Sequence, residues 1–570
     1  MMLRRLLGPL LLVGVGLIAC ALIFASEGSA AQSPITRVSL SSLEAQALGG
    51  ESENPAITSD GGLVAFSSSA NNLVANDLNN QADIFVRDRQ AGTTERISLD
   101  SSGDEADNGS YNPDFSSDGR FVAFESSATN LVANDTKGFE DIFVHDLQTG
   151  ETERVSVDSA GNEADGGDSR YPSISGNGRY VAFVSYATNL APNDSNDLAD
   201  VFVHDRQTGV TERVSVSNTG QQATGANDNS ESAEISDDGR FVAFDTNAPL
   251  VAGDTLGKTD VFVRDRQAHT TERISVSSNG DEANDASFYP GMTPDGRYVA
   301  FQSRANNLVS DDNNAMQDIF VRDRVLGTTE RVSVKTGGAE ITGTDGAYDQ
   351  AISGDGRFIL FDTRANGVVS GDNAGKADVF VHDRQTNTTE IESVNASNQR
   401  GDNDSYGSDF PNTLSADGRY LVLMSDAANL VPNDSNEHRD IFFRDRGAIA
   451  TATPVSTPTP SPTPAPTIIH NTATPSPTVT ATPSAAIVGD ADCNGIIEAN
   501  DVAALLSLVA SLSSPCSADL GLGTPVQIPE DVDCDGSITA LDALDVLLSL
   551  VELPEMPLPS SCNVVGQPIG

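Results

Sequence analysis

YPSISGNGRYVAFVSYATNLAPNDSNDLADVFVHDRQTGVTERVSV, residues 171–216, decides the fold. The stretch contains four short runs rich in Val, Ile, Phe and Tyr, namely Pro172–Ser175, Arg179–Ser185, Asp200–Asp205 and Thr211–Val216. An Asn-Gly turn separates the first two runs, and a Gln-Thr-Gly turn separates the last two. Runs of this composition, bounded by turn residues, predict four antiparallel strands.

The same unit recurs along most of the chain. Its turn glycine returns every 57 to 62 residues, at Gly61, Gly119, Gly178, Gly239, Gly296, Gly356 and Gly418. A four-strand unit repeated at this period predicts the blade of a β-propeller. The second and third strands, such as YVAFVS and DVFVHD, hold apolar residues in succession, which is typical of strands covered on both faces. The fourth, TERVSV, alternates and fits an outer strand.

The two ends of the repeat region complement each other. The seventh unit stops at Arg446 without a TERVSV strand, whereas Ile35–Leu40, ITRVSL, precedes the first complete unit. We therefore predict seven blades, with the N-terminal strand supplying the outer strand of the last blade and removing its open edge. Val38 and either Ile35 or Leu40 should face the blade, while Arg37 and Ser39 should point outward or along the edge.

Antiparallel order assigns every connection to one of two faces. Connections from the second to the third strand, and from blade to blade, leave from the long-loop face, which is rich in Asp, Asn, Glu and Gly. The short turns leave from the turn face. We expect this turn face to be studded with arginines, namely Arg120, Arg179, Arg240, Arg297, Arg357 and Arg419 beside the turns and Arg87, Arg89, Arg264, Arg266, Arg322 and Arg324 at the third-strand ends.

Two polar features of the repeats have competing interpretations. An Asp-x-Asn-x-x-x-Asp pattern suits a Ca²⁺ site or an Asx turn that leads into a strand, and we favour the turn. It occurs at Asp77/Asn79/Asp83, Asp194/Asn196/Asp200, Asp312/Asn314/Asp318 and Asp434/Asn436/Asp440. Histidines replace arginine in three third strands, and we expect surface substitutes rather than ligands or bases at His145, His204 and His382.

Composition limits the function classes. The 570 residues carry 82 acidic and 33 basic side chains, a formal net charge of -49. Binding to a nucleic-acid backbone is excluded, because phosphate contacts need an excess of Lys and Arg. An acidic surface suits divalent cations better. Aromatic residues make up 5% and Trp is missing, which counts against a carbohydrate-stacking platform.

The first 31 residues have the order of a secretory signal. Arg4 and Arg5 precede an apolar run from Leu6 to Phe24, and Ser29-Ala30-Ala31 offers a cleavage site before Gln32. A retained membrane anchor is the alternative, because the run is nearly long enough to span a bilayer. Leu17–Cys20 is similar to a bacterial lipobox, so lipidation is a further alternative. We expect secretion or display on a bacterial cell surface.

The domain boundaries follow from composition. The propeller is predicted over residues 32–446, and residues 447–486 are a Thr-, Ser- and Pro-rich stretch with almost no charge. Proline blocks helices and ladders, so this stretch is predicted to be an extended linker. Residues 487–570 form a third, small module.

Two loops in this module have the residue spacing of calcium-binding loops. Each places oxygen donors at positions 1, 3, 5 and 12 with Gly at position 6, and each is followed by an apolar, helix-like segment. We predict a small α-helical module that binds Ca²⁺ as its cofactor. The predicted metal ligands are Asp490, Asp492, Asn494, Ile496 and Asp501 in the first loop, and Asp531, Asp533, Asp535, Ser537 and Asp542 in the second.

Both parts resemble known families. PxxSxDGRxVAFxS followed by DIFVRD resembles the WD40-like or TolB-like (PD40) propeller repeat of bacterial exported proteins. The paired loops resemble a dockerin, which implies calcium-dependent folding and attachment to a cohesin. Positions 10 and 11 of the loops carry Ala499/Asn500 and Ala540/Leu541 instead of the hydroxyl residues common there, which puts a standard cohesin partner in doubt.

Four cysteines lie in the same module, and repeat symmetry favours one pairing among three. One cysteine of each half falls at loop position 4 and the other beyond the apolar segment. In an exported protein this predicts two disulfides, which would join Cys493 to Cys516 and Cys534 to Cys562.

The predicted function is non-catalytic. We expect an exported monomer whose propeller is an interaction platform, tethered through its calcium module to a cohesin-like or other extracellular protein. A polysaccharide is an alternative partner. The rival function is hydrolysis of O-glycosyl bonds in polysaccharide breakdown, which requires paired carboxylates. Glu125, Asp245 and Asp362 differ between blades and are the only candidates, and we assign no catalytic residue. A third alternative is a TolB-like envelope protein.

Overall fold

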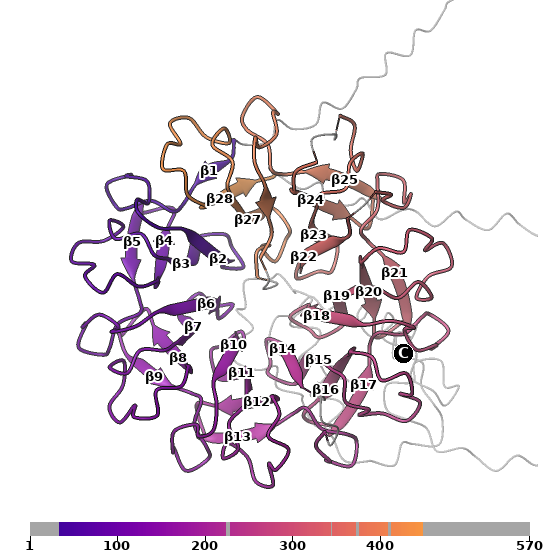
Figure 1. Cartoon of the computed structure of the whole chain (residues 1–570), viewed down its shortest axis with the longest axis horizontal. Helices are drawn as coiled ribbons and strands as arrows, with labels where there is room; N and C mark the ends of the chain where they lie inside the picture. Colours follow the sequence, from indigo (N-terminus) through magenta and orange to yellow (C-terminus); the bar gives the residue numbers. More distant parts are fainter. Residues whose placement is uncertain (1–33, 224–228, 344, 372–374, 409–411, 448–570) are drawn as a thin grey trace, which may run out of the picture. The chain divides into compact units, whose positions relative to one another are not determined.

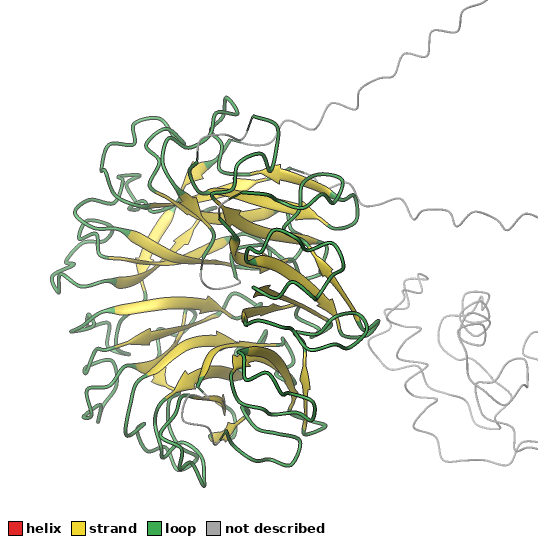
Figure 2. Ribbon diagram, turned by 45° about the vertical axis from the view of Figure 1, so that its right-hand side comes forward, coloured by secondary structure: helices red, strands yellow, loops and turns green. Residues whose placement is uncertain are grey.

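The computed structural model describes residues 34–223, 229–343, 345–371, 375–408 and 412–447. They form seven four-stranded antiparallel sheets around a central axis (Figure 1). Strands and loops are the only elements in these ranges (Figure 2), which confirms the predicted all-β propeller. No helix long and apolar enough to cross a membrane occurs in the described part of the chain.

Within each blade the strands are given from the axis outward, and blade 1 begins with β2. Blade 1 contains β2 (Ser52–Ile57), β3 (Leu63–Ser68), β4 (Asp83–Asp88) and β5 (Thr93–Arg96). Blade 2 contains β6 (Ser110–Phe115), β7 (Phe121–Ser126), β8 (Asp141–Asp146) and β9 (Thr152–Arg154). Blade 3 contains β10 (Ser169–Ile174), β11 (Tyr180–Ser185), β12 (Asp200–Asp205) and β13 (Val210–Arg213). Blade 4 contains β14 (Ser230–Ile235), β15 (Phe241–Thr246), β16 (Asp260–Asp265) and β17 (Thr270–Arg273).

The last three blades repeat this order. Blade 5 contains β18 (Ser287–Met292), β19 (Tyr298–Ser303), β20 (Asp318–Asp323) and β21 (Thr328–Arg331). Blade 6 contains β22 (Ala347–Ile352), β23 (Phe358–Thr363), β24 (Asp378–Asp383) and β25 (Thr388–Ile391). Blade 7 contains β26 (Ser405–Tyr406), β27 (Tyr420–Ser425) and β28 (Asp440–Asp445), and its outermost strand is β1 (Thr36–Arg37) from the other end of the described chain.

The core lies between neighbouring blades. In blade 3, Phe183 of β11 and Phe202 of β12 face each other in the ladder, with ring centroids 6.0 Å apart. Buried residues of blade 3 pack against buried residues of blade 4 in one cluster, and similar clusters join the other neighbouring blades. The unbroken apolar runs of the second and third strands are therefore explained, because both faces of each sheet are covered.

The N-terminal strand closes the ring as predicted. Thr36 and Arg37 pair with Phe443 and Phe442 of β28, and β1 lies beside β28 in Figure 1. Ile35 is buried in the cluster between blades 6 and 7. Val38 is buried in the cluster between blades 7 and 1. The closing strand thus contributes to the packing on both sides of the last blade.

The prediction that Arg37 and Ser39 point outward is wrong, because both are buried. Arg37 forms ion pairs with Asp434, at 3.1 Å, and with Asp440, at 3.4 Å. The Ser39 hydroxyl donates to Asp440 Oδ1 over 2.6 Å and accepts from the backbone N–H of Ile441. Apolar neighbours therefore bury Ile35 and Val38 and carboxylates bind Arg37 and Ser39, while Thr36 remains exposed.

Candidate functional site

The repeated aspartates bind an arginine. In blade 2, Arg154 Nη1 lies 3.4 Å from Asp135, 3.1 Å from Asp141 and 3.5 Å from Glu163. Burial, and then the charge of Asp141, raise the pKa of Asp135 to about 7. We call this arrangement an arginine clasp. Matching clasps centre on Arg96 (Asp77, Asp83, Glu105), Arg273 (Asp254, Asp260, Glu282), Arg331 (Asp312, Asp318, Glu340), Arg213 (Asp194, Asp200) and Arg37 (Asp434, Asp440).

The clasps bear on the two interpretations of the Asp-x-Asn pattern, a Ca²⁺ site and an Asx turn. In three blades the carboxylates lie close enough together to hold a metal ion, with ligand atoms within 4.8 Å of one another. A guanidinium group already lies among them, and it supplies the positive charge. The Asn of the pattern forms the predicted Asx turn, since Asn79 Oδ1 accepts from the backbone N–H of Gln81 over 2.8 Å. Asn196, Asn314 and Asn436 accept in the same way.

The three histidines are not surface residues, and that expectation is wrong. His145, His204 and His382 are buried, and Nδ1 of each lies 2.8–2.9 Å from the hydroxyl of a threonine on the adjacent outer strand. Arg264 and Arg322 bond the equivalent threonines in other blades. The histidine therefore replaces an arginine in a buried hydrogen bond between strands.

The turn face holds the arginines predicted beside the turns, but they are engaged, whereas Arg87, Arg264 and Arg322 lie within the sheets and bond threonines of the outer strands. Arg179 binds Asp205 through two hydrogen bonds of 2.8 and 2.7 Å, and its guanidinium lies 4.7 Å from the Tyr180 ring centroid. Arg266 of the next blade approaches the same ring to 4.6 Å. Asp205 has its pKa held well below its usual range by Arg179. Arg179 therefore joins two strands of blade 3, and Arg266 joins blade 4 to blade 3, so the face is not an open cationic surface.

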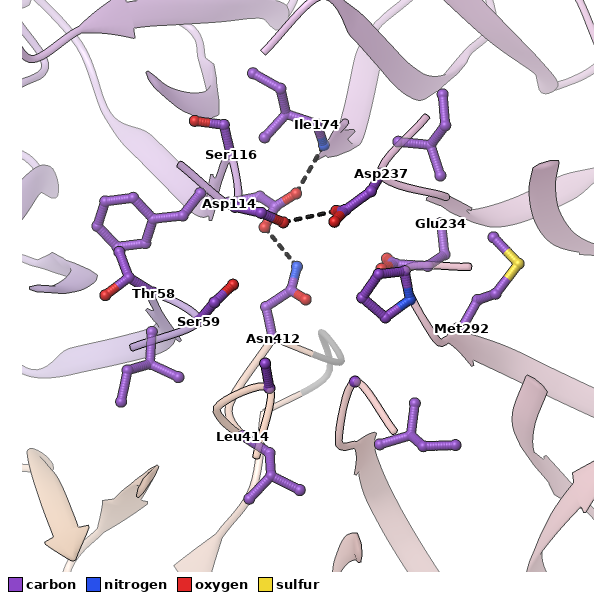
Figure 3. Close-up of a pocket in the computed structure, with 18 residues that line it drawn as sticks. Thr58, Ser59, Asp114, Ser116, Ile174, Glu234, Asp237, Met292, Asn412 and Leu414 are labelled. Carbon is purple, nitrogen blue, oxygen red and sulfur yellow. Dashed lines mark hydrogen bonds between the residues drawn. The ribbon is translucent and has the colours of Figure 1, made fainter. Parts of the chain in front are cut away.

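The axis is closed at the turn face. One apolar side chain from each blade surrounds it: Ile57, Phe115, Ile174, Ile235, Met292, Ile352 and Leu414. The cavity among them, which we call the axial pocket, has a volume of about 80 Å³ (Figure 3). This space holds a few water molecules and is too small for an organic ligand.

Two buried carboxyls and an amide form the polar part of the axial pocket. Asp114 Oδ2 accepts from the backbone N–H of Ile174 over 2.7 Å, and Asn412 of blade 7 donates to Asp114 Oδ1 across the axis (Figure 3). Burial raises the pKa of Asp114 to about 7. Burial, and then the Asp114 charge, raise the pKa of Glu234. These groups join blades 2, 3, 4 and 7.

The three carboxylates that differ between blades are buried within the sheets. Glu125 accepts hydrogen bonds from Asn112 Nδ2 and from the backbone N–H of Tyr171 in the next blade, and burial raises its pKa to about 8. Asp362 accepts from the backbone N–H of Gly407 and shares a hydrogen bond with Asp349. Asp245 accepts from the Ser232 hydroxyl. Glu125 and Asp362 thus join second strands to the following blade, Asp245 joins two strands of blade 4, and none of the three lines either cavity that we describe.

The long-loop end of the inner strands carries the residues that break the repeat. Six of the nine tyrosines lie there, five on inner strands and one directly after β11: Tyr111, Tyr171, Tyr186, Tyr289, Tyr348 and Tyr406. The other three sit at the turn-face position that Phe occupies in alternate blades. We call the six the mouth tyrosines. Four of them expose more than a third of their surface.

Backbone strain accompanies two of these rings. Each inner strand of blades 1–6 has an irregularity in its pairing at the third or fourth residue. Tyr171 and Tyr289 occupy this position with φ angles of 58° and 49°. Asn tolerates such a conformation, as at Asn54 and Asn112, whereas a bulky ring makes it costly. Tyr171 is half-buried against the core between blades 3 and 4, whereas Tyr289 is 44% exposed, and strain at this exposed ring points to a function for the side chain.

A groove opens beside the mouth tyrosines on blade 1. It has a volume of about 380 Å³, and its walls come from the start of β2, the end of β3, the loop before β4, Tyr111 of blade 2 and His438 of blade 7. We call it the blade-1 groove. Its polar lining includes Glu51, Glu53, Asn80 and Gln81. Of the two cavities that we describe, this groove is the one large enough to accept a small organic group.

The sequence reasoning missed the groove and the mouth tyrosines. It aligned the second and third strands, where the repeat is strongest, whereas these residues lie on inner strands and in loops. Tyrosines that recur at one end of the inner strands, off the repeat pattern, were the available signal. The predicted calcium ligands Asp490–Asp501 and Asp531–Asp542, and the four paired cysteines, lie outside the described residues.

Comparison with known proteins gives a likeness of fold. No protein-family model and no curated protein sequence matches the chain. TolB from Acinetobacter baumannii is similar in structure, with 13% identity and a TM-score of 0.34 over 60% of this chain and 64% of that chain. An oligogalacturonate lyase in complex with manganese has 10% identity and a TM-score of 0.42 over 73% and 97%. The propeller domain of the Trilobed protease from Pyrococcus furiosus has 13% identity and a TM-score of 0.42 over 70% of this chain and 95% of that chain.

Proposed function

We propose that this protein is an exported, non-catalytic binding protein whose propeller captures its partner at the long-loop mouth. The observation that carries the proposal is the gathering of the mouth tyrosines at one end of the inner strands, off the repeat pattern. Tyr side chains supply large contact area with a polar tip, and they are enriched where proteins bind partners. The repeat itself does not require them.

The remaining surfaces favour this mouth by elimination among the described residues. The turn-face arginines are bound to aspartates and stacked on rings, and the axial pocket there is too small for an organic ligand. The mouth also carries arginines that are paired with carboxylates: Arg170 with Glu140 and Arg364 with Asp404, and their side chains are 44% and 47% exposed. Tyr and Arg together are typical of binding hot spots.

The buried carboxylates support a binding role over hydrolysis. A glycoside hydrolase needs two carboxyl groups that face the same substrate bond. Glu125 and Asp362 instead accept hydrogen bonds from the backbone of the following blade. Their burial and raised pKa values follow from this structural role. The C-terminal calcium module is proposed to attach the protein to a cohesin-like or other extracellular partner, and the N-terminal segment to direct export.

A binding screen tests the proposal. The full chain is applied to glycan and extracellular-protein arrays in calcium, beside the triple variant Tyr111→Ala, Tyr289→Ala, Tyr348→Ala. We expect at least one ligand to bind the parent and to be lost by the variant. Tyr180→Phe on the turn face is the matched control, because Phe121 and Phe241 occupy this position in neighbouring blades. Retained binding by the triple variant, or release of shortened glycan, contradicts the proposal.

A further inference from the structure

We infer that the blade-1 groove binds one ring of an uncharged saccharide; this deepens the proposed function and rests on it. The volume of about 380 Å³ lies in the range of small-molecule sites. It is lined by one aromatic ring and by several amide, carboxylate and hydroxyl groups. A sugar ring presents the complementary pattern: a face of C–H groups and a rim of hydroxyls that both donate and accept.

Tyr111 provides a fixed platform. Gly109 lies against its ring, and a Cβ atom added at Gly109 would lie 2.5 Å from the Tyr111 hydroxyl and 2.8 Å from Cε2. A side chain at position 109 would therefore displace the Tyr111 ring, which lies against the backbone of Gly109 while 37% of Tyr111 stays exposed. The electron-rich face of a fixed phenol attracts the C–H groups of a sugar. Although aromatic residues are few in this chain, this one is positioned for stacking.

Two polar side chains of the groove are available for a ligand, those of Glu51 and Gln81. No hydrogen bond holds the side chains of Glu51 or Gln81 within the described residues, while Glu53 is paired with Arg439 over 2.9 Å. Burial, and then the charges of Glu140, Glu125 and Glu53, raise the pKa of Tyr111, so its hydroxyl remains a donor. Carboxylate and amide oxygens accept from sugar hydroxyls, and the amide of Gln81 also donates.

Charge decides between neutral and acidic sugars. Glu51 and Glu53 line the groove, and the nearby Arg439 is also bound to Asp426, 3.0 Å away. A uronic acid would bring a third negative charge beside these two carboxylates, which is unfavourable. The groove therefore selects an uncharged ring over an acidic one.

Titration calorimetry of the full chain tests the inference. The probes are cellohexaose, xylohexaose, mannohexaose, maltohexaose and hexagalacturonate. We expect one neutral probe to bind, Tyr111→Ala to weaken it at least tenfold, and Tyr111→Phe to weaken it less. Glu51→Gln should raise the affinity for hexagalacturonate relative to the parent. Tyr180→Phe, on the turn face and outside the mouth tyrosines, is the control that should bind like the parent.

The outcomes separate this inference from the proposed function. Binding of no neutral probe, preference for hexagalacturonate, or equal binding by parent and Tyr111→Ala overturns the saccharide site. If an array ligand is nevertheless lost in the triple mouth variant, the proposed function stands and the partner is of another class, such as a protein. If neither experiment shows binding at the mouth, both are overturned.

Discussion

One guanidinium group stands among the buried carboxylates of each blade, although its position in the sequence changes. Five blades take it from the fourth strand, as with Arg154. Blade 6 has Ile391 at that position, and there Arg400, which corresponds to Glu163 of blade 2, lies 3.4 Å from Asp378. Blade 7 takes it from Arg37 of the closing strand. The positive charge is present in every blade although different sequence positions supply the arginine, which indicates that the clasps serve stability rather than ligand binding.

Arg154→Ala should convert a clasp into a weak calcium site. Removing one partner of a buried ion pair costs about 3–5 kcal/mol, since the remaining charges are uncompensated. Three carboxylates within 4.8 Å then remain. We expect a lower propeller Tm that millimolar Ca²⁺ partly restores. Arg213→Ala is the control, because Gln222 leaves only two carboxylates in that blade, and it should recover less. Equal calcium responses would contradict this account.

Asp362→Asn should change how stability depends on pH. Burial, and then the Asp349 carboxylate, raise the pKa of Asp362 well above its usual range. A group with a raised folded pKa gives stability that is complete below its unfolded pKa of about 4 and is lost as pH rises through the folded value. Asn keeps the acceptor for Gly407 and donates to Asp349 without titrating. Gln302 and Val184 show that other blades accept uncharged residues here.

The measurement for Asp362→Asn is the free energy of unfolding between pH 4 and pH 9. We expect the two proteins to be close at pH 4 and the variant to be the more stable one at the alkaline end. Parallel curves across this range would mean that Asp362 ionises freely in the fold.

At the scale of strands, the predicted bounds were most accurate where the sequence repeat is most regular. The third strand was predicted as Asp200–Asp205 and has those bounds. The inner strand, predicted as Pro172–Ser175, is Ser169–Ile174, because its irregular pairing at Tyr171 lets it continue toward the long loops. The outer strand, predicted as Thr211–Val216, ends at Arg213. Beyond it the Ser215 hydroxyl accepts from the backbone N–H of Val201, so a side chain replaces the regular ladder.

Removing the closing strand should destabilise the propeller. A chain that begins at Ser41 loses Ile35 and Val38 from two cores, and it leaves Asp440 without Arg37 and Ser39. Both apolar side chains are worth about 1.5–3 kcal/mol each, and β28 becomes an open edge. We expect a Tm well below that of a chain beginning at Gln32, together with aggregation.

Transplanting the strand provides the control. Ile35–Leu40 appended after Arg446 through a short Gly-containing turn should restore the Tm of the Ser41 chain, because the blade needs the strand rather than its covalent origin. Equal melting of the chains that begin at Gln32 and at Ser41 would contradict closure by this strand.

At the scale of the molecule, the fold was predictable and the site was not. Blade number and ring closure follow from a pattern that repeats seven times, so each unit reinforces the others. The blade-1 groove is made from blades 1, 2 and 7, and its residues share no motif. Tyr111 and His438 are brought together by the closed ring, which a linear pattern does not show. Function on a repeat fold lies in its departures from the repeat.

Calcium should act on one end of the chain and leave the propeller unchanged. Residues 487–570 contain 13 acidic side chains and no Lys or Arg, so the predicted loops have no internal cation. The propeller clusters already contain arginines. Binding to the folded form at 100 times Kd adds about 2.7 kcal/mol of stability. Calorimetry of the full chain should therefore show two transitions, of which EGTA lowers only one. Asp492→Ala with Asp533→Ala should abolish that calcium response and leave the propeller Tm unchanged. A calcium-dependent propeller transition in the unmodified chain would instead place a functional metal among the clasps.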